Sequence, residues 1–367
     1  MKTKILFIMQ LPPPVHGASM INKTILDSKL INEKFEADYV NLTTAADVKN
    51  IGKLNLKKVF KAFSIYLRVI KKLFSTKYNL VYLTLSPQGL AFYKDALLSL
   101  FIKLLGFKLV FHLHGKGIRE IVSGNKIKAS IYKKTFKNVS VIHLSKLLYF
   151  DIENIIAREQ VYFLANGIES GNNFSIEHKS PTNKILYLSN MQESKGSYLL
   201  LQAAQLLRDK GLDFHIDFVG KWHNDNKFKE KWLKFYKDNN LNECITYHGP
   251  RYNDEKHVFF KEARIFALPT NNDCFPISIL EAMSYGASIV STEEGAIPEI
   301  VHNNHNGFLF EKNNPIELAL KLEKLLINDN LNSLMQKKAH KKYSELYTKG
   351  KFEQDFCSII QSILTKV

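Results

Sequence analysis

The sequence predicts an α/β fold with two doubly wound, Rossmann-like domains that face each other across a cleft. Short apolar segments of strand length alternate with longer amphipathic segments of helix length, the pattern typical of parallel sheets built from α/β units. This alternation runs through the first half of the chain and then starts again in the second. A length of 367 residues, 45% of them hydrophobic and 23% charged, is enough for two domains with cores of their own.

The first half is expected to contribute six strands, each a short apolar run bounded by polar or turn-forming residues. Its first apolar run is too short for a signal peptide and is followed by three prolines. The apolar stretch 96–105 contains Lys103 and is shorter than the ~20 residues of a membrane-spanning helix. We therefore expect a cytoplasmic or peripheral protein. The expected strands are residues 5–9, 37–41, 80–84, 108–113, 139–143 and 161–164.

The second half repeats this organisation. The polar stretch 169–183 predicts a linker, so the domains are expected at residues 1–170 and 183–350, and a closing helix at 351–367 is expected to pack back on the N-terminal domain. In doubly wound folds, ligands bind at the carboxyl ends of the strands. The expected strands are residues 184–189, 214–220, 245–247, 265–269, 288–292 and 307–310.

The two halves of the chain differ in net charge. The chain has 51 basic and 35 acidic residues, a formal net charge of +16. Residues 1–180 contain 27 basic and 12 acidic residues, whereas residues 181–367 contain 24 and 23. A basic domain beside a nearly neutral one indicates that an anionic partner belongs to the first half.

The segment 49–77 carries nine Lys or Arg residues and no acid, and its apolar residues at spacings of three, four and seven predict an amphipathic helix. We interpret it as a helix that docks on an anionic membrane. The alternative is an ordinary helix that covers a sheet, and Ile65 and Val69, which fall among the lysines, blur the amphipathic pattern. The stripe residues are Leu56, Val59, Phe60, Phe63, Leu67, Ile70 and Phe74. The residues assigned to the membrane or the acceptor are His16, Lys57, Lys58, Lys61 and Arg68.

Several classes of site are disfavoured. The three cysteines are far apart, so neither a disulfide framework nor a zinc site is expected, and a reducing compartment fits best. The chain has no GxGxxG, GxxxxGK[ST], HExxH or GxSxG motif, and no Asp-x-Asp pair that would hold a metal on a nucleotide. We expect no metal and no cofactor.

The second half carries the most informative motif. Asp273 and Glu281 are separated by seven residues within NDCFPISILEAM, and GASIVST and GAIPEIV follow. This arrangement resembles the retaining nucleotide-sugar glycosyltransferases of family 4, whose pattern is acid, seven residues, Glu-Ala-Met, then small-Gly-x-Pro-Val and Gly-x-x-Glu-Ile-Val. The resemblance implies the GT-B fold. Further segments resemble that family in the same order along the chain: PPVHGA at 13–18, HLHG at 112–115, NGI at 166–168 and Lys195-Gly196.

The resemblance implies a reaction with named residues. The departing group is a nucleoside diphosphate, so negative charge must be stabilised by Lys195 and by backbone N–H groups at a helix N-terminus. Asp273 would contact hydroxyls of the donor sugar, and Glu281 the ribose. His114 would lie near the reacting carbon and completes the expected catalytic set. The expected donor-binding residues are Gly17, Asn190, Lys195, Gly220, Arg251, Asp273, Phe275, Pro276, Ile277 and Glu281.

Three departures from the family pattern leave the donor open. The first acid is Asp273 where Glu is commoner, Ser189-Asn190 stands where many members have Gly-Arg, and His16-Gly17 replaces a double glycine. Without that arginine, Lys195 carries more of the diphosphate charge unless Arg251 or Lys116 contributes.

The expected function is retaining, metal-independent transfer of a sugar from a UDP- or GDP-sugar to a lipid-linked or cell-surface polysaccharide acceptor at the inner face of the cell membrane. A soluble sugar-phosphate acceptor is the alternative, with the basic residues binding its phosphate. A nucleic-acid partner would leave the Asp273–Glu281 spacing unexplained, so none is expected. A sugar-nucleotide epimerase of the same fold would need carboxylates in the first half, where acids are scarce.

Overall fold

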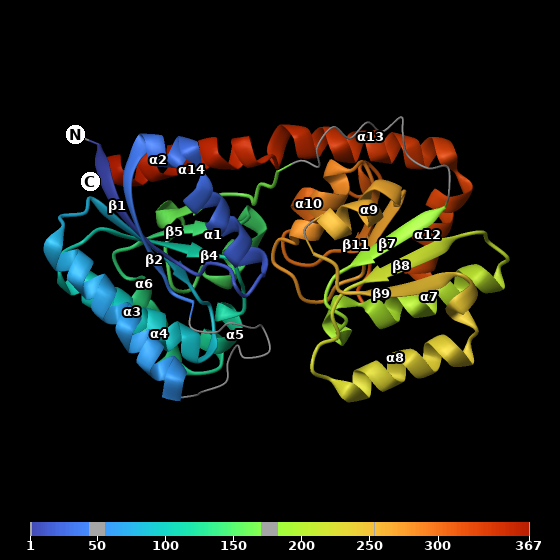
Figure 1. Ribbon diagram of the computed structural model, residues 1–367, viewed down its shortest axis with the longest axis horizontal. Coiled ribbons are helices and arrows are strands. Elements are labelled where there is room, and N and C mark those ends of the chain that lie inside the picture. The colour runs from blue at the N-terminus through green and yellow to red at the C-terminus, as the bar shows by residue number, and fades with distance from the viewer. Residues whose placement is uncertain (1, 44–55, 170–182, 253, 367) are drawn as a thin grey trace. The chain divides into compact units, whose positions relative to one another are not determined.

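The structure is a computed structural model that describes residues 2–43, 56–169, 183–252 and 254–366. The chain divides into two compact units, Met1–Gly167 with Lys349–Val367, and Ile168–Thr348. Nearly all of the expected linker, 169–183, lies outside the described residues. All twelve expected strands are present, with no end shifted by more than two residues. Both units are Rossmann-like α/β folds, as the sequence predicts (Figure 1).

The sheet of the first unit is parallel and six-stranded, in the order β2-β1-β3-β4-β5-β6. The strand order reverses between β1 and β3, and such a reversal opens a crevice outside the carboxyl ends of the strands. The strands are β1 (Thr3–Met9), β2 (Phe35–Asn41), β3 (Leu80–Leu85), β4 (Leu109–Leu113), β5 (Ser140–His143) and β6 (Val161–Phe163).

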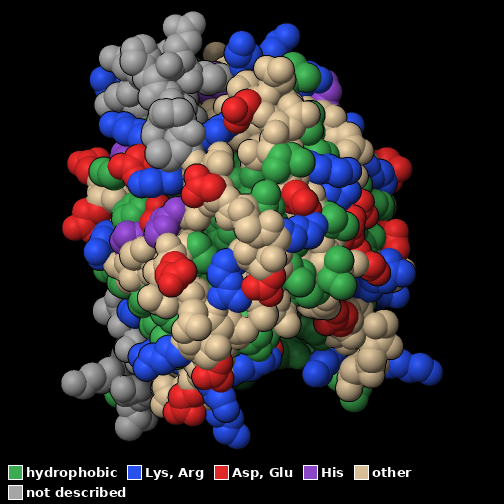
Figure 2. Space-filling view, turned by 90° about the vertical axis from the view of Figure 1, so that its right-hand side faces the viewer, with side chains coloured by type: hydrophobic (Ala, Val, Ile, Leu, Met, Phe, Trp, Pro, Cys, Tyr) green, Lys and Arg blue, Asp and Glu red, His purple; other side chains and the backbone are tan. Residues whose placement is uncertain are grey.

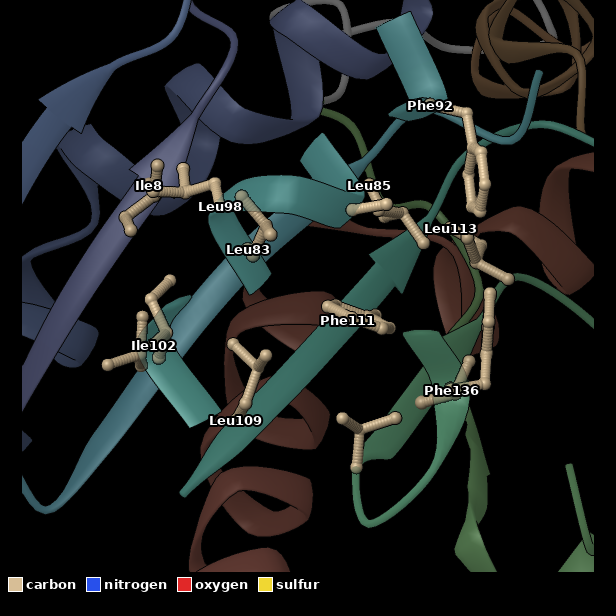
Figure 3. Close-up of a cluster of buried hydrophobic side chains, with 14 of the residues drawn as sticks. Ile8, Leu83, Leu85, Phe92, Leu98, Ile102, Leu109, Phe111, Leu113 and Phe136 are labelled. Carbon is tan, nitrogen blue, oxygen red and sulfur yellow. The ribbon is translucent and has the colours of Figure 1, made fainter. Parts of the chain in front are cut away.

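Helices cover both faces of this sheet. On one face, side chains of α3, α4 and α6 pack on alternate residues of the strands, among them Leu83 and Phe111 (Figure 3). On the other face Phe356 of α14 contacts Phe7 and Tyr82, with ring centroids 6.3 and 5.7 Å apart. The helices are α1 (Gly17–Asp27), α2 (Lys29–Lys34), α3 (Leu56–Ser75), α4 (Gly89–Leu104), α5 (Ile118–Ser123), α6 (Lys126–Phe136) and α14 (Lys349–Thr365).

The second unit has a parallel six-stranded sheet in the order β12-β11-β10-β7-β8-β9, and its order reverses between β7 and β10. The strands are β7 (Lys184–Leu188), β8 (His215–Val219), β9 (Ile245–Gly249), β10 (Ile265–Leu268), β11 (Ser288–Thr292) and β12 (Gly307–Phe310). The helices are α7 (Ser197–Asp209), α8 (Asn226–Asp238), α9 (Asp254–Glu262), α10 (Ile277–Ser284), α11 (Ile297–Ile300), α12 (Pro315–Ile327) and α13 (Asp329–Leu346). On the face drawn in Figure 2, acidic and basic side chains are interspersed, in keeping with the nearly neutral second half.

Helix α3 buries a different set of residues from the expected stripe. Ile65, Val69 and Leu73 face the core, because their spacing of four residues places them on one side of the helix. Of the expected stripe, Phe60, Phe63, Leu67 and Phe74 are exposed instead. The side chains of residues 56–59 and 62, which include Lys57 and Lys58, lie outside the described part of the chain.

No helix within the described ranges is long and apolar enough to cross a membrane.

Candidate functional site

Lys195 and Asp273 meet at the reversal point of the second sheet. The loop after β7 carries Lys195 and the loop after β10 carries Asp273, and both loops leave the carboxyl ends of neighbouring strands. The Lys195 Nζ lies 2.7 Å from Asp273 Oδ1 and also donates to the Asn272 carbonyl oxygen at 2.7 Å. The two side chains are 16% and 19% exposed, so the ion pair is partly shielded and still open to a ligand.

Glycines allow these loops to approach one another closely. Gly196 has a φ of +74°, and a Cβ built there would lie 1.9 Å from the Pro269 carbonyl oxygen. Gly220, expected to frame the donor, lies at the end of β8, where a Cβ would be 1.8 Å from the Ser189 carbonyl oxygen. The loop backbones are also bonded directly, because the Asn271 N–H donates to the Ser194 carbonyl oxygen at 2.8 Å. The position of Lys195 therefore depends on contacts that only glycine permits.

Two helices begin at this edge of the sheet without a side-chain cap. The N-cap of α7 is Gly196, directly after Lys195, and the N-cap of α10 is Pro276, three residues after Asp273. The first N–H groups of a helix lack intrahelical partners and carry the positive end of its dipole, so they attract anions. Phe275 is buried and packs edge to face on Tyr347 at 5.9 Å, and Ile277 is the first residue of α10.

Two other acids near this edge each have a cation of their own. Glu281 in α10 forms an ion pair with Lys256 of α9. Glu294, only 3% exposed in the loop after β11, accepts the Asp273 N–H at 3.3 Å and forms an ion pair with Lys312. Sequence reasoning missed Lys256, Glu294 and Lys312. The available signal for Glu294 was its place directly before the GAIPEIV segment.

Two expected donor-binding side chains have no part in this cluster. Arg251 is exposed, and its guanidinium donates to the neighbouring Pro250 carbonyl oxygen at 3.1 Å. Asn190 is exposed, and its carbonyl oxygen accepts from the Tyr187 hydroxyl at 3.1 Å. In the part of the chain that the structure covers, no hydrogen bond or ion pair joins either side chain to Lys195 or Asp273.

In the first unit, His114 follows the end of β4. Its ring lies 4.0 Å from that of His112, centroid to centroid. Both ring nitrogens of His114 are buried and meet no hydrogen-bond partner among the described residues. Burial lowers the pKa of His114 to about 3, so the imidazole is neutral at physiological pH. The adjoining loop is held by Asp151, whose carboxylate accepts the N–H groups of residues 117–119 at 2.9–3.1 Å.

A third histidine, which is buried, and a tyrosine join this cluster and were missed in the sequence. His143 ends β5, accepts the Leu144 N–H at its Nδ1 at 2.9 Å, and has a pKa lowered to about 3 by burial. Tyr82 of β3 is hydrogen-bonded to Nδ1 of His112. The available signal for His143 was its place at the end of a strand, in the run VIHLS, whereas Tyr82 lies within β3 and has no such signal.

His16 and Gly17 form the start of α1. His16 is the N-cap, and its Nδ1 accepts the Ser19 N–H at 3.3 Å, while burial lowers its pKa. Gly17, the first helical residue, is exposed. Of the remaining residues assigned to membrane or acceptor, Lys61 and Arg68 are exposed on α3. Among the described side chains, no group of three His, Cys, Asp or Glu residues is placed to hold a metal ion.

Comparison with known proteins relates the chain to glycosyltransferases. Residues 170–342, slightly less than half of the chain, match the family model of glycosyl transferases group 1. An uncharacterized glycosyltransferase of Methanocaldococcus jannaschii is 27% identical over 229 residues, which are 62% of this chain and 60% of that protein. A poly(ribitol-phosphate) alpha-N-acetylglucosaminyltransferase of Staphylococcus aureus is 23% identical over 257 residues, which are 69% of this chain and 50% of that protein. The matches thus span less than two thirds of the length of these relatives.

Solved structures match the whole chain. A glycosyltransferase from Rickettsia africae has a TM-score of 0.74 at 19% identity and covers 100% of both chains. HepE of Anabaena, in complex with UDP, has a TM-score of 0.77 at 17% identity and covers 98% of this chain and 100% of its own. These likenesses show that the chain has the GT-B fold. Together with the family match across Lys195, Asp273 and Glu281, they support a transferase.

Proposed function

We propose that this chain is a retaining, metal-independent glycosyltransferase that moves a sugar from a UDP- or GDP-sugar to a lipid-linked or cell-surface polysaccharide acceptor at the inner face of the cell membrane. The observation that carries the proposal is the Lys195–Asp273 pair, which lies at the reversal point of the second sheet between two uncapped helix N-termini. Doubly wound folds bind nucleotides at this point.

Charge development explains why these groups suit the reaction. When the bond from the sugar to the diphosphate breaks, negative charge accumulates on the phosphate oxygen. Lys195 supplies a fixed cation, and the N-terminus of α10 supplies N–H groups and a positive dipole end. Groups already in place need little reorganisation during the reaction, so no metal ion is required in this proposal.

Asp273 has two functions in the proposed mechanism. Its Oδ1 holds the Lys195 ammonium in position, and its other oxygen accepts hydrogen bonds from hydroxyls of the donor sugar. Glu281, oriented by Lys256, accepts hydrogen bonds from the two vicinal hydroxyls of the ribose. The acceptor hydroxyl attacks the face that the diphosphate leaves, and the departing phosphate takes its proton, so the anomeric configuration is retained.

The first unit provides the acceptor side in this proposal. His114 is neutral because burial lowers its pKa to about 3, so it acts as a hydrogen-bond partner for the sugar or the acceptor and not as an acid. The name of the Staphylococcus aureus relative gives poly(ribitol-phosphate) as its acceptor, and UDP is bound in the Anabaena structure. Both are consistent with a nucleotide-sugar donor and an acceptor that matches the basic first half.

A thermal-shift screen with UDP, GDP and their common sugars tests donor binding. A ligand at 100 times its dissociation constant stabilises the folded state by about 2.7 kcal/mol, so a true donor gives a clear rise in Tm. Activity is then measured with the donor that binds, with and without EDTA, and the anomeric configuration of the product is read by NMR. An inverted product, or activity that EDTA abolishes, would contradict the retaining or the metal-independent part.

Two matched variants test the site itself. Lys195→Ala removes the cation from the proposed phosphate position and is expected to lower kcat by about 10²–10³, the usual effect of losing one oxyanion donor. Lys210→Ala removes an exposed lysine that pairs with Glu323 at 2.5 Å in the same unit and is expected to leave kcat unchanged. Equal activity of the two variants would refute the assignment of Lys195.

A further inference from the structure

Two neighbouring helices of the first unit expose apolar stripes with the same spacing. Along α3 the exposed residues are Phe60, Phe63, Leu67 and Phe74, and along α4 they are Leu90, Tyr93, Leu97 and Leu104. In both helices the spacing is three, four and seven residues, which places each set along one side. The most open of these side chains are Leu104 at 85% and Phe60 at 73% exposure.

Both stripes point away from the same face of the sheet. Helix α3 packs on the sheet through Ile65 and Val69. Helix α4 packs on the same face through Phe92, Leu98 and Ile102 (Figure 3). In each helix these buried residues lie on the side opposite the exposed stripe. The Tyr66 hydroxyl of α3 donates to the Lys94 carbonyl oxygen of α4 at 2.7 Å, so the two helices are neighbours (Figure 1).

The surface around the stripes is basic. A groove of about 370 Å³ between β2 and α3 is lined by Arg68, Lys71 and Lys72, of which Lys72 pairs with Asp38 at 2.6 Å. A second groove, of about 490 Å³, borders α6 and is lined by Lys133, Lys134 and Lys137. Lys134 and Lys137 also lower the pKa of Lys103, after the larger effect of burial. The acid-free sequences of α3 and α6 and the burial of Asp95 in α4 leave these three helices without an exposed carboxylate.

We propose that α3 and α4 together form a membrane-docking face that binds an anionic phospholipid leaflet. The two stripes enter the boundary between headgroups and acyl chains, and the basic grooves receive lipid phosphates. Large exposed apolar patches on soluble proteins mark interaction sites, and a rim in which basic side chains predominate favours an anionic partner. The face deepens the proposed function by naming how the enzyme reaches a membrane acceptor, but it uses none of the residues of the transfer site.

Co-sedimentation with vesicles tests the face. The full chain is expected to pellet with vesicles that contain about one third phosphatidylglycerol, and to bind phosphatidylcholine vesicles at least tenfold more weakly. Phe63→Glu/Leu67→Glu on α3 and Leu97→Glu/Leu104→Glu on α4 are each expected to weaken binding at least tenfold. Ile316→Glu/Leu320→Glu changes two exposed apolar residues of α12 in the other unit and is expected to bind as the wild type does.

The possible outcomes distinguish failure of the membrane-docking face from failure of the transfer site. A wild-type chain that does not pellet, or an α4 variant that pellets as the wild type does, overturns the two-helix face. If the chain does not bind vesicles but forms dimers, and the same variants abolish these dimers, the stripes are assigned to contact with a second copy instead. The nucleotide-induced rise in Tm is expected to stay unchanged in all three variants, so loss of membrane binding is distinguishable from failure of the proposed reaction.

A gain-of-signal variant covers the case in which a glutamate variant does not fold. Leu97→Trp places an indole on the α4 stripe, while the two native tryptophans, Trp222 and Trp232, lie in the other unit. Brominated phosphatidylglycerol is expected to quench the added fluorescence at low salt. If the protein pellets with the vesicles but the brominated lipid does not quench the added fluorescence, insertion of α4 is refuted.

Discussion

Replacing Gly196 with alanine provides a sharp test of how the transfer site is built. At this residue φ is +74°, and a Cβ would lie 1.9 Å from the Pro269 carbonyl oxygen and 2.9 Å from Cγ of Pro269. The left-handed conformation costs a non-glycine residue about 1–2 kcal/mol. The overlap is with backbone, so the loops after β7 and β10 must also separate, and overpacking of this kind costs about 1–3 kcal/mol. We therefore expect a loss of about 2–5 kcal/mol.

Gly211 provides the matched control. Its φ is +73°, but a Cβ at this position meets nothing within 4 Å. Gly211→Ala is therefore expected to cost only the conformational part, about 1–2 kcal/mol. The difference between the two variants isolates the steric contact between the loops.

Urea unfolding, followed by the fluorescence of Trp222 and Trp232, gives both free energies, since both tryptophans lie in the second unit. Gly196→Ala is also expected to weaken binding of the donor nucleotide, because Lys195 and Asp273 are carried by the loops that move apart. Equal unfolding free energies and equal nucleotide affinities for the two variants would refute the close approach of these loops.

Three further predictions concern buried charge. Burial holds the pKa of His114 and His143 at about 3, below the unfolded value near 6.5. The free energy of unfolding therefore falls as the pH drops from 6.5 toward 3, by roughly 1.4 kcal/mol per pH unit for each histidine. His143→Asn is expected to make the urea midpoint depend less steeply on pH. Lys312→Ala leaves the buried Glu294 carboxylate without its cation and is expected to lower stability by about 1–3 kcal/mol, whereas an undiminished urea midpoint would contradict this. Asp151→Asn weakens the bonds to the N–H groups of residues 117–119 and is expected to cost about 1.5–3 kcal/mol and to speed amide exchange there.

The sequence was enough to predict both sheets, because each strand is a short apolar run with turn-forming residues on either side. It also singled out Lys195 and Asp273 as site residues. The contact between Lys195 and Asp273 could not be predicted from the sequence. The two residues are 78 positions apart, and their loops meet only because the sheet order places β7 beside β10. For the same reason the cation partners of Glu281 and Glu294 could not be predicted, because they come from other elements of the unit.

Helix α3 shows where amphipathic reasoning reaches its limit. Its sequence contains two apolar sets, one through Ile65 and Val69 and one through Phe60, Phe63 and Leu67, and periodicity alone does not say which set faces the sheet. Packing decides: β-branched side chains fit the pleated surface under the helix, whereas the phenylalanines stay outside, where no described element covers them. A helix that only covered the sheet would need one apolar set. Because the second set recurs with the same spacing on α4, its exposure is better explained by a surface that both helices share than by an accident of one sequence.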